Sequence, residues 1–166
     1  TGSFRKVAAY VMQFDRLMEA LTVRETLWFA VELRSSVRLP FLEKVAILEE
    51  TLRDLDLVPY ADVRCAGLSG GQKRRVTVAL ELVARPSLVF LDEPTSGLDG
   101  AAALKLVSVL RALADRGRTI VCTIHQPRAD AFDMFHSALI MNKGHVIYFG
   151  AVDGILPHFT AGGFKL

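Results

Sequence analysis

The sequence predicts an α/β fold, in which a parallel sheet core carries an inserted, mainly helical lobe. After residue 86, strand-like apolar runs alternate with helical patterns, an order typical of parallel strands joined by right-handed crossovers. One of these runs, Leu88–Leu91, is apolar at every position, as in strands that are buried on both faces of a sheet. Between residues 22 and 85 the apolar spacing is mainly helical, so we expect this block to form the lobe.

The first half of the chain is expected to hold one strand and three helices. An apolar, partly β-branched strand ends at Gln13, and Thr22 with Glu25 forms a capping box that opens the first helix. Pro40 suits the start of a second helix, because its fixed φ is already helical and its missing N–H would have no partner there. The expected elements are a strand at 7–12 and helices at 22–34, 40–55 and 72–84, with a loop at 58–67.

The second half is expected to supply the rest of the sheet. Asp99 can cap a helix that begins at Gly100, and a mainly β-branched strand leads to His125. Lys143 and Gly144 form the turn of a predicted hairpin. The expected elements are strands at 87–91, 119–124, 138–142 and 146–149, and helices at 100–116, 128–135 and 152–159.

Composition and charge limit the possible classes of protein. The net charge of +2 is too small to argue for nucleic acid as a partner, and we interpret the basic cluster Lys73–Arg75 as a solvated helix face. The two cysteines, Cys65 and Cys122, lack the spacing of metal ligands, and we interpret Cys122 as a buried, inert thiol. No apolar run approaches the roughly 18 residues that a membrane helix needs.

Two features of the chain suit phosphate chemistry. Asp92 and Glu93 follow the buried strand, at the carboxyl edge where open α/β sheets place their ligands. Ser69–Gly71 lies at the start of a predicted helix, where glycines allow the backbone to approach an anion and the first N–H groups lack helical partners. An anion-binding turn and a metal-holding pair of carboxylates together indicate nucleoside triphosphate chemistry.

Taken in order, five features resemble the nucleotide-binding domain of ABC transporters. They are Gln13, the turn Leu68–Gln72 (Leu-Ser-Gly-Gly-Gln), the pair Asp92 and Glu93, then Asp99 and His125. In that family these are the Q-loop, the signature motif, Walker B with its catalytic glutamate, the D-loop and the H-loop. Each signal is weak singly, and their order and spacing carry the resemblance. It implies a P-loop-NTPase-like sheet core with the ABC-type helical lobe.

Four further stretches look like subfamily G, the white-like half-transporters. They are Tyr10–Gln13, Leu21–Leu27, Thr123–Pro127 and Gly144–Gly150. Two positions depart from the subfamily's pattern, because Gln72 stands where Glu is usual and Phe14 where Asp is frequent. The resemblance divides the chain into three parts: residues 1–21 with the Q-loop, 22–85 with the signature motif, and 86–166 with Walker B, the D-loop and the H-loop.

The resemblance assigns ATP and Mg²⁺ as cofactors and implies a role for each strand-end residue. Asp92 would hold Mg²⁺, and Glu93 would act as general base or orient the attacking water. Gln13 would touch Mg²⁺ and the water, and His125 would bond the γ-phosphate and fix Glu93. Structural alternatives stay open, since Glu93 could be a salt-bridged strand-end carboxylate and His125 a satisfied core histidine.

The signature turn is expected to serve a partner. The resemblance implies that Ser69, Gly70, Gly71 and Gln72 contact the γ-phosphate of a nucleotide held by a second nucleotide-binding domain in a head-to-tail dimer. Asp99 would contact that interface, although it also has a purely local role as a helix cap. A transmembrane domain is the other implied partner, which would place this domain at the cytoplasmic face of a membrane.

The chain contains no P-loop of the form Gly-x-x-x-x-Gly-Lys-[Ser/Thr]. Neither Gly2 nor Gly67 begins such a motif. We therefore expect an amino-terminally truncated ABC ATPase domain, poorly soluble or incompletely folded as an isolated segment.

The leading hypothesis is the ATP-hydrolysing motor of an ABC-type membrane transporter. The first alternative is a catalytically incompetent ABC-like interaction fragment, which the missing P-loop would favour. The second is a non-transport ABC ATPase, of the DNA-repair or ribosome-associated kind. The subfamily-G sequence pattern around His125 and the lack of a long coiled-coil insertion argue against this last class.

Overall fold

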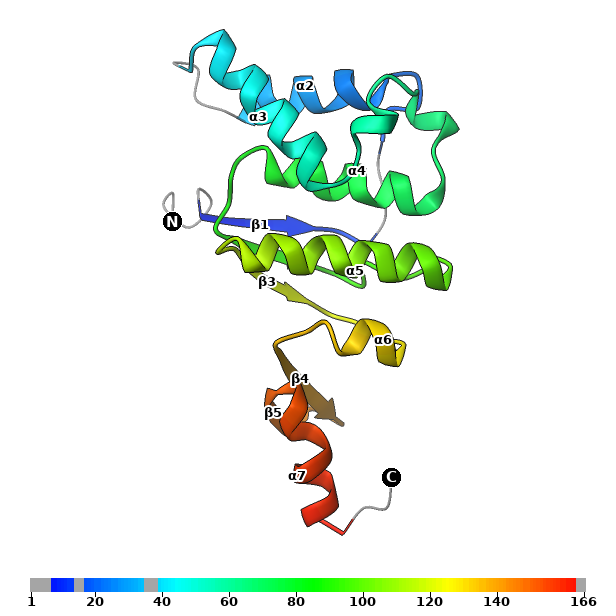
Figure 1. Ribbon diagram of the computed structural model, residues 1–166, viewed down its shortest axis with the longest axis vertical. Helices are drawn as coiled ribbons and strands as arrows, with labels where there is room; N and C mark the ends of the chain where they lie inside the picture. Colours follow the sequence, from blue (N-terminus) through cyan, green and yellow to red (C-terminus); the bar gives the residue numbers. More distant parts are fainter. Residues whose placement is uncertain (1–6, 14–16, 35–38, 164–166) are drawn as a thin grey trace. The chain divides into compact units, whose positions relative to one another are not determined.

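A computed structural model describes residues 7–13, 17–34 and 39–163, so that Phe14 lies outside the described part. The chain forms two compact units, residues 1–126 and residues 127–166. The first unit contains the parallel sheet and the long helices, and the second contains a hairpin with short helices (Figure 1). The three-part division expected from the sequence stays a prediction.

The sheet of the first unit is parallel, as predicted. Its strands β1 (Ala8–Val11), β2 (Leu88–Leu91) and β3 (Thr119–Cys122) lie in the order β1-β2-β3. The register pairs Val11 with Leu91 and Leu91 with Cys122, so all three strands end at the same level. The residues that follow them therefore meet at one carboxyl edge.

The helical lobe contains α2 (Val23–Arg34), α3 (Phe41–Asp54) and α4 (Gly70–Leu82). The predicted capping box opens α2, since Glu25 Oε2 accepts from Thr22 N at 2.8 Å and Thr22 Oγ1 accepts from Glu25 N at 3.1 Å. The bonds that the Glu25 carboxylate accepts from the backbone N–H and the hydroxyl of Thr22 lower the pKa of Glu25. The predicted loop at 58–67 contains two short 3₁₀ turns, Val58–Tyr60 and Cys65–Gly67.

Helix α4 begins two residues earlier than predicted because Ser69 caps it. Ser69 Oγ accepts from Gln72 N at 3.3 Å, and Gln72 Oε1 accepts from Ser69 N at 2.8 Å, which completes a second capping box. Gln72, expected from the sequence as part of the signature turn, also closes that turn with its side chain. Gly70 and Gly71 are consequently the first residues of the helix.

Helix α4 joins the lobe to the sheet. It contacts α2 and α3 on one side, and β1 and α5 (Gly100–Asp115) on the other (Figure 1). Apolar residues from every layer form a single buried cluster, which includes Leu27, Leu52, Val76, Leu91 and Leu110. The lobe and the sheet of this unit therefore share one core.

Two residues of the basic cluster are buried, and the expectation of a solvated helix face is wrong for them. Arg74 is 3% exposed and Arg75 is 7% exposed. Both guanidinium groups point inward because backbone carbonyls accept their hydrogen bonds, which offsets the cost of removing a charge from water. Lys73 is partly exposed and pairs with Glu19 at 3.4 Å.

Cys122, at the end of β3, is partly buried. Burial raises its thiol pKa to about 11, so the thiol stays protonated at neutral pH, in agreement with the interpretation of an inert cysteine.

The second unit is built on an antiparallel hairpin of β4 (Ser137–Asn142) and β5 (His145–Ala151). Its turn residues Lys143 and Gly144 both have positive φ, 48° and 81°, as a type I′ turn requires. Helix α6 (Ala129–Phe132) is shorter than predicted, since the bond from Met134 N to Ala131 O already tightens the chain into a turn. A 3₁₀ turn (Val152–Gly154) and α7 (Ile155–Ala161) follow the hairpin.

Candidate functional site

The ends of the three parallel strands bring several predicted site residues together. Asp92 N donates to Val11 O at 3.0 Å, and Thr123 N donates to Leu91 O at 3.1 Å, so the strands are hydrogen-bonded up to their last residues. Gln13, Asp92 with Glu93, and Thr123 therefore emerge from neighbouring strands at one edge. This edge is where an open parallel sheet places its ligands.

Asp92 is oriented by two hydroxyl groups. Thr123 Oγ1 donates to Asp92 Oδ1 at 2.8 Å, and Tyr10 OH donates to Asp92 Oδ2 at 3.2 Å. Desolvation and the Asp92 carboxylate raise the pKa of Tyr10, so its hydroxyl remains a donor at neutral pH. Asp92 itself is half-buried, which leaves its carboxylate within reach of a hard cation such as Mg²⁺.

Glu93 adopts a backbone conformation that is unusual for a residue with a side chain. Its φ is +40°, in the left-handed region, and such strain is typical of functional positions. Its N–H donates to Thr123 Oγ1 at 2.9 Å, which holds the turn. Its Oε2 accepts from Gln13 Nε2 at 3.1 Å. The structure thus places two predicted catalytic residues in direct contact.

Thr123 also lies at this edge, and the sequence pattern assigned it no role in the site. Its hydroxyl accepts from the backbone N–H of Glu93 and donates to the carboxylate of Asp92, and so connects the two carboxylate residues. A signal did exist, because Thr123 directly follows β3 at the level where Asp92 follows β2.

Arg74 is the second residue whose role the sequence analysis missed. Its guanidinium reaches from α4 to the strand ends and donates to four backbone carbonyls within the described part of the chain. The acceptors are Met12 O at 2.6 Å, Gln13 O at 3.0 Å, Asp92 O at 3.1 Å and Pro94 O at 3.2 Å. The signal was obscured by its neighbours Lys73 and Arg75, which made the segment look like an exposed basic face.

The signature turn lies against the segment that contains Asp99. A Cβ added to Gly70 would lie 3.7 Å from Leu98 Cδ2, and one added to Gly71 would lie 2.8 Å from Ala102 Cβ. Asp99 caps α5, because its Oδ1 accepts from Ala101 N at 3.0 Å and from Ala102 N at 2.9 Å. The local role that the sequence offered for Asp99 is therefore confirmed, and its contact with a partner stays a prediction.

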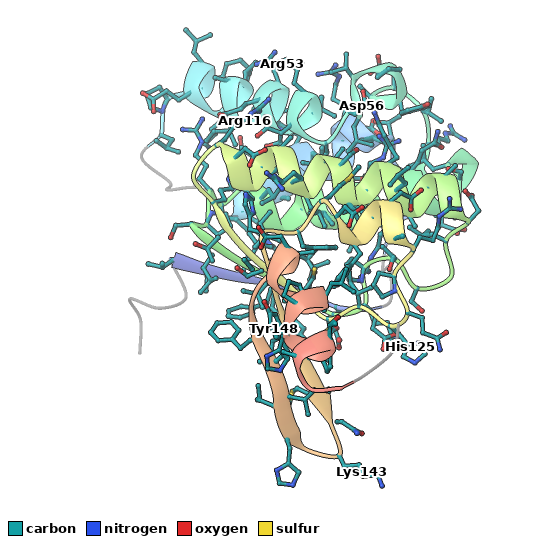
Figure 2. All side chains as sticks on the ribbon, turned by 60° about the horizontal axis from the view of Figure 1, so that its bottom comes forward. Arg53, Asp56, Arg116, His125, Lys143 and Tyr148 are labelled. Atoms are coloured by element: carbon teal, nitrogen blue, oxygen red, sulfur yellow. The ribbon has the colours of Figure 1, made fainter. Side chains whose placement is uncertain are left out.

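His125 follows β3 and is exposed to solvent (Figure 2). Within the described residues no hydrogen bond joins His125 to Glu93, so their predicted contact stays a prediction. The described residues contain no group of three His, Cys, Asp or Glu residues that could hold a metal ion by themselves. The carboxylate of Asp92 and the amide oxygen of Gln13 fit Mg²⁺, which takes few protein oxygens and completes its shell with water and phosphate.

Comparison with known proteins shows the family. Residues 1–96 match the family model described as "ABC transporter". This chain belongs to the ABC transporter family. It is 43% identical over 168 residues to ABC transporter G family member 1 of Dictyostelium discoideum, covering 97% of this chain and 21% of that protein. It is also 43% identical over 162 residues to ABC transporter G family member 11 of Arabidopsis thaliana, covering 95% and 23%. These relatives confirm the resemblance to subfamily G.

A solved structure confirms the fold class. The chain resembles cbiO1 from Clostridium perfringens, described as part of the ABC transporter complex cbiONQ, with a TM-score of 0.82 and 26% identity. The similarity covers 96% of this chain and 63% of that one. The chain spans less than a quarter of the length of the two curated relatives named above. Among the described residues no helix is long and apolar enough to cross a membrane.

Proposed function

We propose that this chain is the ATP-hydrolysing motor segment of an ABC-type membrane transporter, where ATP binding and hydrolysis drive substrate transport. One observation carries the proposal beyond family membership. Gln13, Asp92 and Glu93 meet at one sheet edge, and the hydroxyl of Thr123 connects the two carboxylate residues. Phosphoryl transfer to water depends mainly on positioning and on neutralising charge; such a cluster supplies the positioning, and the Mg²⁺ that Asp92 would hold would supply the positive charge.

Asp92 is the residue we assign to Mg²⁺. The two hydroxyl donors fix its carboxylate plane, and Gln13 contributes an amide oxygen from the neighbouring strand end. When bound, Mg²⁺ would neutralise the charge that develops on the phosphate oxygens.

Glu93 is the residue we assign to the attacking water. Gln13 donates to Oε2 of Glu93, so we assign Oε1 to the water proton. Glu93 then acts as general base or holds the water in line with the γ-phosphorus. His125, at the end of the adjacent strand, donates to the γ-phosphate in this proposal and would keep Glu93 aimed at the water.

The signature turn is assigned to the nucleotide of a partner domain. The first N–H groups of α4 have no helical acceptors, so those of Gly70 and Gly71 suit an incoming phosphate. Ser69 would add its hydroxyl, Gln72 would hold the turn closed, and Asp99 would contact the interface. The proposed partners are a second nucleotide-binding domain, head to tail, and a transmembrane domain. This arrangement places the chain at the cytoplasmic face of a membrane.

Replacement of Glu93 by Gln in the full-length protein tests the proposal. The P-loop that would hold the nucleotide does not occur in these 166 residues, so the full-length polypeptide is the proper sample. Glu93→Gln removes the general base but keeps the shape, and we expect ATP to bind while hydrolysis is lost. Glu43→Gln, on the exposed first turn of α3, is the control and should hydrolyse ATP normally. Normal hydrolysis by Glu93→Gln would contradict the role given to Glu93.

A further inference from the structure

We propose that Arg74 is a positioning residue. It holds the backbone carbonyls of Gln13 and Asp92, so that the side chains of these two residues are kept in the geometry that ATP hydrolysis requires. This inference rests on the proposed function. The four described carbonyls that accept from Arg74 belong to two segments, 12–13 and 92–94, which lie about 80 residues apart in sequence and follow neighbouring strands of the sheet. The last described strand hydrogen bond between β1 and β2 runs from Asp92 N to Val11 O, so residues 12–13 and 93–94 lie beyond it.

The chemistry of the guanidinium group explains why arginine suits this place. Its planar fork offers five N–H donors in fixed directions, whereas the lysine ammonium offers three donors at a single point. Arg74 is 3% exposed, so each of its donors must find an acceptor within the protein. The donors Nε, Nη1 and Nη2 all bond to the strand-end segments. The charge is therefore retained in the interior by contacts that depend on the positions of both segments.

The carbonyls that Arg74 holds belong to the site residues themselves. Arg74 bonds Gln13 O at 3.0 Å while the side chain of Gln13 bonds Glu93 Oε2 at 3.1 Å. It bonds Asp92 O at 3.1 Å while the carboxylate of Asp92 bonds Thr123. A shift of either backbone segment would therefore displace a side chain that touches the reacting groups.

Arg74 also lies one helical turn after the signature turn. Gly70 and Gly71 precede it by four and three residues in α4, on the same side of the helix. A movement of the start of α4, such as phosphate binding at the signature turn would cause, can reach Gln13 and Asp92 through the hydrogen bonds of Arg74. The position thus links the partner-facing end of α4 to the hydrolysis site of the same chain.

Arg75 is a matched control on the same helix. It is 7% exposed and also donates to backbone carbonyls, Leu55 O at 3.3 Å and Asp56 O at 3.1 Å. Those acceptors lie just past the end of α3, where Asp56 is labelled in Figure 2. Arg75 thus holds two parts of the lobe together and, in its described contacts, touches neither strand-end segment.

The first test compares Arg74→Lys with Arg75→Lys in the full-length protein. Lysine keeps the charge, but its donors are all on one nitrogen atom, so it cannot bond the carbonyls of segments 12–13 and 92–94 in the way that the guanidinium does. For Arg74→Lys we expect kcat for ATP hydrolysis to fall about tenfold or more, because misplacement of a site by about 1 Å can cost a hundredfold in rate. The Mg²⁺ concentration for half-maximal hydrolysis should rise, and KM for ATP should change less than about threefold. Arg75→Lys should lower thermal stability to a similar degree yet keep kcat within about twofold.

The second test measures the geometry without activity. Hydrogen–deuterium exchange in the segments 10–13 and 92–97 should be faster in Arg74→Lys than in wild type, and unchanged in Arg75→Lys. If Arg74→Lys does not fold, Arg74→Gln removes the buried charge and should give the same local exchange pattern and the same loss of kcat.

The outcomes separate this inference from the proposed function. Equal kcat and equal local exchange in the two Lys variants would assign Arg74 a structural role only and overturn the inference. A wild-type protein without ATPase activity would overturn the proposed function, and the exchange data alone would then decide whether Arg74 holds the two segments.

Discussion

At the scale of single residues, one hydroxyl group organises the two carboxylate residues. Thr123 Oγ1 lies 2.8 Å from Asp92 Oδ1 and 2.9 Å from Glu93 N, and acts as donor to the first and acceptor from the second. The hydroxyl thereby fixes both the plane of the Asp92 carboxylate and the left-handed turn at Glu93. This turn places the carboxylate of Glu93 within hydrogen-bonding distance of the Gln13 side chain.

Replacing Thr123 by Val should show how much this hydroxyl contributes. Valine keeps the shape but leaves the N–H of Glu93 without its acceptor, and an unsatisfied polar group costs about 1–3 kcal/mol when it is buried. Because Glu93 is only half-buried, we expect a loss at the low end of that range, together with a fall of about tenfold or more in ATP hydrolysis. Denaturant unfolding and steady-state ATPase assays measure the two effects.

Thr123→Ser is the matched variant, since it retains the hydroxyl group. It should keep most of the hydrolysis rate. If valine and serine variants hydrolyse ATP equally fast, the hydroxyl of Thr123 does not position the carboxylates during turnover.

At the scale of elements, the packing of α4 against α5 requires a glycine. A Cβ at Gly71 would lie 2.8 Å from Ala102 Cβ, a separation that real Cβ atoms do not show. A Cβ at Gly70 would meet Leu98 Cδ2 at an ordinary 3.7 Å. The two glycines of the signature turn therefore differ, although the sequence presents them as equivalent.

Gly71→Ala should consequently destabilise the chain more than Gly70→Ala. Overpacking of a tight contact costs about 1–3 kcal/mol, and the better helix propensity of alanine, up to about 1 kcal/mol, offsets only part of this. We expect a lower free energy of unfolding for Gly71→Ala and a change within about 0.5 kcal/mol for Gly70→Ala. Urea unfolding of the full-length protein measures both, and equal stabilities would mean that α5 moves away without cost.

Most elements could be predicted from the sequence because their signals are local, although the local cap at Ser69 was missed and the start of α4 was placed two residues late. The strand at 88–91 and the cap at Asp99 depend on residues that are close in the chain, and the structure confirms both, although only Val89 and Leu91 of the strand are buried. The burial of Arg74 could not be read in this way, because its acceptors come from residues 12–13 and 92–94. A basic cluster on a helix indicates solvent unless the distant carbonyls that meet it are known. Family resemblance supplied the assignments of Gln13 and His125, which no local pattern singles out.

At the scale of the whole molecule, large apolar side chains remain exposed in both units. In the first unit, Met12 directly follows the outer strand β1 and is 62% exposed, and Val121 in the outer strand β3 is 47% exposed. The lobe exposes Leu33 at 84% and Leu42 at 78%, and the hairpin exposes Phe149 at 77%. Exposed apolar groups on outer strands and helix ends are sites where chains associate.

We therefore expect the isolated 166-residue chain to self-associate at micromolar concentration. Light scattering coupled to size-exclusion chromatography would detect species larger than one chain of 18.3 kDa. Leu33→Lys with Leu42→Lys is the matched variant, because both side chains are exposed and outside the buried cluster, so charge there should reduce association without loss of helix content. A monodisperse monomer that unfolds cooperatively would contradict the expectation, and would mean that the shared core of lobe and sheet is sufficient to keep this segment soluble.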